Sequence, residues 1–219
     1  MLKENKMKHN KKIKIKPSNV FSFSYDSRDL EKRWLRGSTK GSYAAAQDSE
    51  SASIRETNLA AYLKSLTVDG LADSQAALKR FLKDFAPFHG EVLNSTEIAR
   101  ATNLSTYAVN NYLAVLQSTN FIRALQPWYQ DLTKRQVKTP KIYIKDSGNL
   151  HTLFEVSTQE QLRAHEKLNN SWKGFVLEEI IAHYGLKDDD CYFWSTHAGT
   201  WLDLFIILDG KRIGFEFKC

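Results

Sequence analysis

The sequence predicts an α+β chain in which a helical body, interrupted by a short pair of strands, is followed by a smaller α/β unit. Three observations predict this fold class. Two short amphipathic segments between residues 93 and 118 are joined by a tight turn, and two β-rich runs follow them across a polar loop. Residues 201–219 then place two more β-rich runs on either side of an Asp209-Gly210 pair, which is a strong signal for a β-hairpin.

Composition and charge describe a globular body with a basic tail. The chain has 219 residues, of which 42% are hydrophobic and 12% aromatic, enough to build buried cores. The formal net charge is +6, and residues 1–16, "MLKENKMKHNKKIKIK", supply all of it, so the rest of the chain is balanced. We expect residues 1–20 to form a disordered, solvated tail, and non-specific attraction to nucleic acid is the alternative role.

The sequence also favours a cytoplasmic protein without a membrane partner. No apolar run reaches the length of a membrane span, and no apolar stretch follows the N-terminal lysines as it would in a secretory signal. The two cysteines, Cys191 and Cys219, are too few for a disulfide framework and fit a reducing compartment.

Residues 21–72 are predicted to form a helical linker. Residues 26–46 mix a short helical signal with Gly and Ser turns, and residues 50–66 carry a ragged apolar stripe at helical spacing. The polar break at 67–74 separates this linker from a further helix at 75–88.

Residues 93–125 have the pattern of a helix-turn-helix. Asn94 or Ser95 can cap a short helix through "TEIARA", and "TNLS" has the length of the turn in this motif. Ser105 can cap the second helix, whose inward stripe has helical spacing and consists of Val109, Tyr112, Leu113 and Leu116. Four polar or aromatic side chains remain outside near the start of this helix, where such helices contact base edges: Thr106, Tyr107, Asn110 and Asn111.

The next residues, "FIRALQPWY", a polar loop and "IYIKD", predict strand, loop and strand, so that residues 73–147 form a winged helix-turn-helix. The basic side chains of this wing region could contact phosphates. They are Arg123, Lys134, Arg135, Lys138, Lys141 and Lys145, against one acid, Asp131. We assign the DNA contacts to Lys134, Arg135 and Lys138. Winged helices also serve as protein–protein modules, and the exposed face of the second helix has no Arg or Lys, so this alternative stays open.

Residues 148–219 are predicted to form a partial α/β unit. A strongly apolar helix at 168–184 is followed by a strand near "CYFWS" and by the hairpin. With a two-residue turn, Asp203 would lie directly across from Glu216 and Trp201 across from Lys218. Leu202, Leu204, Ile206, Ile213, Phe215 and Phe217 would then form the core face.

A buried helix followed by a hairpin with Asp203, Glu216 and Lys218 matches the signature of PD-(D/E)XK nucleases. Two carboxylates can hold Mg²⁺, which activates water and stabilises charge on phosphorus, and the lysine can orient that water. We therefore assign Asp203 and Glu216 as metal ligands and all three residues as candidate catalytic groups. An ordinary polar strand face is the simpler reading of Glu-x-Lys.

The chain resembles the C-terminal part of prokaryotic AAA-type ATP-binding proteins, in which a winged helix precedes a nuclease-like domain of unknown function. The segments that carry this resemblance are "RWLRGS", "GEVLNSTEIARATNLS", "LQPWYQDLTKRQVKTPKIYIKDSG", "SWKGFV", "YFWSTHAGTWLDL" and "GFEFK". Family members usually begin with an ATPase domain, whereas this chain has no G-x-x-x-x-G-K-[ST] motif, so no ATP is expected here. The resemblance also implies acids at positions 173 and 201, where this chain has Lys173 and Trp201, and Glu179 could partly compensate. It suggests that the chain is a fragment and its nuclease-like domain truncated.

These observations favour a DNA-associated winged-helix protein with a nuclease-like, degenerate C-terminal domain. An active Mg²⁺-dependent nuclease is the second hypothesis. The third is a protein-interaction module that works with a separate ATPase subunit.

Overall fold

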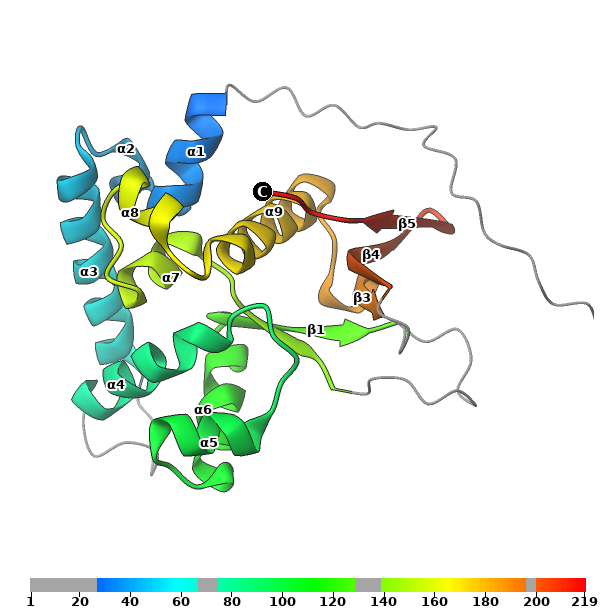
Figure 1. The fold of residues 1–219 in the computed structure, drawn as a ribbon, viewed down its shortest axis with the longest axis horizontal. Coiled ribbons are helices and arrows are strands. Elements are labelled where there is room, and N and C mark those ends of the chain that lie inside the picture. Colours follow the sequence, from blue (N-terminus) through cyan, green and yellow to red (C-terminus); the bar gives the residue numbers. More distant parts are fainter. Residues whose placement is uncertain (1–26, 67–74, 129–138, 196–199) are drawn as a thin grey trace, which may run out of the picture.

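The computed structural model describes residues 27–66, 75–128, 139–195 and 200–219, which form a mixed α+β structure. A group of helices lies on one side of Figure 1 and a twisted five-stranded sheet on the other, with α9 (Leu168–Tyr184) between them. In the described part of the chain, no helix is both long and apolar enough to cross a membrane. The α+β class is therefore confirmed.

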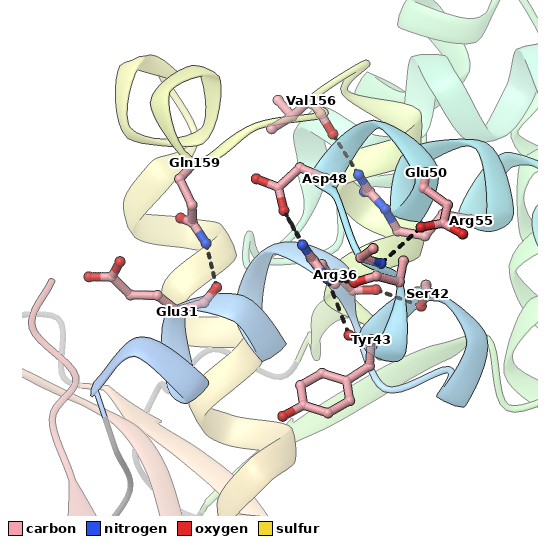
Figure 2. Close-up of polar contacts among 11 residues, drawn as sticks. Glu31, Arg36, Ser42, Tyr43, Asp48, Glu50, Arg55, Val156 and Gln159 are labelled. Atoms are coloured by element: carbon pink, nitrogen blue, oxygen red, sulfur yellow. Dashed lines mark hydrogen bonds and ion pairs between the residues drawn. The ribbon is translucent and has the colours of Figure 1, made fainter.

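The N-terminal helices are α1 (Ser27–Arg36), α2 (Lys40–Ala44) and α3 (Asp48–Ser65). Buried arginines hold them together (Figure 2). The Arg36 guanidinium donates to Asp48 Oδ1 at 2.9 Å, and its own carbonyl accepts from Ser42 Oγ. Arg55 on α3 donates to the carbonyls of Gly148 and Val156, both at 3.1 Å, so α3 is fixed to the segment around α7 (Ser147–Leu153).

The next helices form the core of the middle segment. They are α4 (Gln75–Phe85), the short η1 (Ala86–Phe88), α5 (Ser95–Thr102) and α6 (Thr106–Ser118). The predicted caps are present, because Asn94 accepts from the Glu97 amide and Ser105 accepts from the Ala108 amide. The predicted inward stripe of α6 is buried in one cluster with Phe81, Phe85 and Ile98.

Two strands follow α6 and pair in antiparallel fashion, β1 (Ile122–Pro127) and β2 (Lys141–Ile144). An isolated bridge joins Val92, just before α5, to Lys141 on β2. The loop that carries Lys134, Arg135 and Lys138 lies outside the described residues.

The C-terminal segment contains α8 (Gln159–Ala164), α9, the short η2 (Asp188–Asp190), β3 (Cys191–Ser195), β4 (Trp201–Leu208) and β5 (Lys211–Phe215). The strand order is β2-β1-β3-β4-β5, and β1 pairs with β3 in parallel at Gln126–Tyr192 and Pro127–Phe193. One sheet therefore contains strands from both predicted units, 73–147 and 148–219.

The apolar face of the sheet packs against α9. Leu177, Ile180 and Ile181 of α9 share a buried cluster with Phe193, Leu204 and Ile206 of the sheet. Close approach at one point requires glycine, since a Cβ on Gly174 would lie 2.2 Å from His89 Nε2. His89 is buried there, and its Nδ1 accepts from the Ile144 amide at 3.0 Å.

The predicted hairpin turn is confirmed. Leu208 pairs with Lys211, and Asp209 and Gly210 both have positive φ, 49° and 72°, as a two-residue turn of this kind requires. The predicted register holds from this turn back to the Leu204–Phe215 pair.

Candidate functional site

The first candidate site is the outer face of α6. Thr106, Tyr107 and Asn110 are exposed, Asn111 is half-buried, and Tyr107 keeps 77% of its surface accessible. The Asn110 carboxamide oxygen accepts from Ser95 Oγ at 2.7 Å, which ties it to the start of α5. The structure thus brings the four predicted residues to one helix end, with Tyr107 as the most prominent side chain.

The basic residues expected around this face do not all remain available. Arg123 is buried and forms a bidentate pair with Glu178 of α9, at 2.6 and 2.9 Å, and a further ion pair with Asp188. Lys145 donates to the Asn120 side chain at 2.6 Å. Arg123 therefore holds α9 to β1, and its role as a phosphate contact is a prediction that its burial disfavours.

The second candidate site is the hairpin, where a β-bulge changes which way the side chains point. On β3 and β4, Tyr192 pairs with Phe205 and Trp194 with Leu202, so Asp203 and Leu204 together oppose the single residue Phe193. Such a bulge places two consecutive side chains on the same side of a strand. Asp203 thus joins Leu204 on the α9 side.

The bulge also moves the residues before it. Leu202 lies against Gly214, where a Cβ would be only 2.6 Å from Leu202 Cδ1, and Gly214 pairs with Phe205. The Nζ of Lys173 on α9 lies 5.9 Å from the Trp201 ring centroid. The core face expected from strict alternation is thus wrong for Leu202, which lies on the face away from α9, while Trp201 and Asp203 lie on the α9 side.

Asp203 is the most buried of the predicted catalytic residues, with 1% of its side chain accessible. Its Oδ1 accepts from Lys173 Nζ at 2.8 Å, and its Oδ2 accepts from the Phe217 amide at 2.9 Å. A buried carboxylate needs such partners, because burying it unpaired costs several kcal/mol. The Phe217 amide, which would otherwise continue the strand ladder, thus binds a side chain.

Glu216 and Lys218 do not join Asp203. The paired part of β5 ends at Phe215, so the expected Asp203–Glu216 and Trp201–Lys218 pairs are not formed. Phe215 and Phe217 pack against the α9 cluster, so Glu216 between them points to the other face by strand alternation. Glu216 Oε1 lies 3.5 Å from Lys218 Nζ, and both side chains are exposed.

These residues, as arranged, do not fit a magnesium ion. Mg²⁺ needs oxygen ligands at one point, whereas Asp203 and Glu216 lie on opposite faces and an ammonium group already binds Asp203. Within the described ranges, no group of three or more His, Cys, Asp or Glu side chains could hold a metal ion. Glu179 does not supply the missing acid, since it pairs with Arg33 at 2.8 Å.

A neighbouring cavity was not predicted. It has a volume of about 190 Å³ and is lined by Gly90, Glu91, Lys141, Asn170, Lys173 and Trp201. These residues come from the segment before α5, from β2, from α9 and from β4, which are distant in sequence. Only the departure of Lys173 and Trp201 from the expected acids could have drawn attention to it.

Comparison with known proteins shows relatives whose function is also undetermined. A family model described as a domain of unknown function (DUF8612) matches residues 27–160. Uncharacterized proteins of Mycobacterium tuberculosis and Mycobacterium bovis are each 34% identical to this chain over 193 residues. That alignment covers 88% of the chain but 43% of each relative, so the chain spans less than half of their length. No solved structure matches.

Proposed function

Since the chain belongs to the family of the domain of unknown function DUF8612, we propose a function from its own geometry: it binds duplex DNA through a winged helix-turn-helix. In this proposal α4, α5 and α6 are the three helices, α6 enters the major groove, and β1, β2 and the loop between them form the wing. The bridge between Val92 and Lys141 supplies the third strand position of such a fold.

One observation carries the proposal, the division of α6 into a buried side and an outward N-terminal end. Val109, Tyr112 and Leu116 are at most 4% exposed, whereas Thr106, Tyr107 and Asn110 are exposed at the end that contacts base edges in such proteins. Tyr107 at 77% exposure has no structural reason to be aromatic within the chain. Its hydroxyl and ring can contact phosphate and base edges respectively.

The C-terminal sheet is proposed to be nuclease-like in outline without metal-dependent catalysis. The ammonium of Lys173 lies 2.8 Å from Asp203, where a metal would otherwise balance that carboxylate. An internal cation compensates the buried charge, but it cannot lower the pKa of a bound water as a metal does. Magnesium-dependent plasmid cleavage that disappears in Asp203→Ala would favour the nuclease alternative instead.

Fluorescence anisotropy with a labelled DNA duplex tests the DNA-binding proposal. We expect Tyr107→Ala to weaken binding about tenfold, because one good contact in the groove contributes about 1–3 kcal/mol. Trp201→Ala is the matched control, since it removes another exposed aromatic side chain from a different element and is expected to leave duplex affinity unchanged. Equal loss in both variants, or no duplex binding at all, would contradict the proposal.

The alternative of a protein-interaction module, working with a separate ATPase subunit, rests on the absence of Arg and Lys from the outer face of α6. It predicts duplex binding that is absent or insensitive to salt and to loss of Lys134 and Arg135.

A further inference from the structure

The cavity between β2, α9 and β4 contains a cation that the protein does not balance. Lys141 is half-buried, and in the described part of the chain no carboxylate lies within ion-pair distance of its ammonium. Its recorded neighbour is the ring of Phe193, with Nζ 5.2 Å from the ring centroid. Burial lowers the pKa of Lys141, as expected for a cation withdrawn from water without a direct counter-ion.

The acids near Lys141 already have other partners. Glu91 Oε1 accepts from the Asn170 side chain at 3.0 Å and lies 3.6 Å from Lys167 Nζ. Asp203 is bound by Lys173 and by the Phe217 amide. Three lysines therefore face two carboxylates, and the unbalanced positive charge belongs to Lys141.

Trp201 adds an aromatic surface beside this charge. Half of its surface, 50%, is exposed, which is unusual for tryptophan, and Lys173 Nζ lies 5.9 Å from its ring centroid. An exposed aromatic ring next to a cation is the combination with which proteins bind single nucleic-acid strands, because the ring stacks on a base and the cation pairs with a phosphate.

We propose that this cavity binds a phosphate group of a single nucleic-acid strand, with Lys141 as the pairing cation and Trp201 stacking on the adjacent base. The cavity, at about 190 Å³, has room for a phosphate group, while the base remains outside against Trp201. This binding needs no metal, which agrees with the Lys173–Asp203 pair. It goes beyond duplex binding by α6, because it uses different elements and a different form of nucleic acid.

Anisotropy with fluorescein-labelled oligothymidine, at several salt concentrations, tests the proposal on the full chain. Lys141→Gln should weaken binding at least fivefold and make the slope of log affinity against log salt shallower by about 0.7, the value for one phosphate contact on a single strand. Lys211→Gln is the matched control, because Lys211 is an exposed lysine on β5 outside the cavity. Trp201→Ala should weaken binding about tenfold, and Trp201→Phe should retain most of it.

Further arms separate this proposal from its competitors. Lys141→Arg keeps the charge and should keep the affinity, and circular dichroism melting verifies that each variant is folded. Inorganic phosphate should compete with the oligonucleotide. Equal affinities for Lys141→Gln and Lys211→Gln, or binding of inorganic phosphate without binding of oligothymidine, would overturn the proposal. Tyr107→Ala should leave oligothymidine binding unchanged, so failure of duplex binding by α6 is visible separately.

Discussion

At the scale of single residues, the buried carboxylate of Asp203 decides what the C-terminal sheet can do. Both of its oxygens are occupied, one by the Lys173 ammonium and one by the Phe217 amide. A divalent cation would have to displace Lys173 and would then find Glu216 on the far face. The identity of residue 173 therefore determines the chemistry more than the presence of Asp203 does.

This dependence predicts a specific pattern of stability. Lys173→Met leaves the Asp203 carboxylate buried without its cation and should lower the free energy of unfolding by about 3 kcal/mol. Adding Asp203→Asn should recover at least about 1 kcal/mol, because the neutral amide no longer needs a cation and its oxygen still accepts from Phe217. Urea unfolding of the two single variants and the double variant measures this, and strictly additive losses would exclude a direct pair.

At the scale of secondary-structure elements, local signals in the sequence were sufficient wherever local interactions decide. Asn94 and Ser105 cap their helices, and Asp209-Gly210 forms the hairpin turn, because each depends on residues within one turn. The bulge at Asp203–Leu204 could not be predicted, because it depends on the pairing of β4 with β3. That one extra residue moves Leu202 and Asp203 to the faces opposite those expected.

Buried histidines join the elements around α9. His151 of α7 contacts Ser171 Oγ of α9 at 2.7 Å and the Leu35 carbonyl of α1 at 2.9 Å, and Trp34 Nε1 donates to the same Ser171 Oγ. Ser171 then donates to His151 Nε2, and His151 Nδ1–H donates to Leu35. This network uses the neutral ring, and His89 is likewise neutral against Gly174.

These two histidines make stability depend on pH. Burial lowers the pKa of His89 and of His151 from 6.5 to about 3. The unfolded chain therefore binds protons that the folded chain does not, so the stabilisation is complete above pH 6.5 and is lost as pH falls towards 3. The loss should reach about 1.4 kcal/mol per pH unit for each histidine, as linkage requires.

Urea unfolding between pH 5 and pH 7.5 measures this loss. His151→Gln should roughly halve the slope below pH 6.5, whereas His183→Gln, which changes an exposed residue, should not alter it. A free energy of unfolding that stays constant over this range would show that the histidines are not buried as neutral groups.

At the scale of the whole molecule, the sheet joins what the sequence separates. The predicted units 73–147 and 148–219 each contribute strands, and the β1–β3 pair and the Arg123–Glu178 pair connect them. The sequence predicted the α+β class, the α6 face and the hairpin, but not the Lys141 cavity. Its lining comes from four separate segments, and such a set is defined only when the sheet has formed.

The salt dependence of duplex DNA binding by the intact chain tests the central claim most directly. Binding through α6 and a basic wing should weaken as salt rises, with a slope of log affinity against log salt of about −0.9 for each phosphate contacted. Replacing Lys134 and Arg135 by Gln should make the slope shallower by about 2, whereas Tyr107→Ala should lower affinity and leave the slope nearly unchanged. Duplex affinity that is undetectable, or that does not change with salt, would contradict the account.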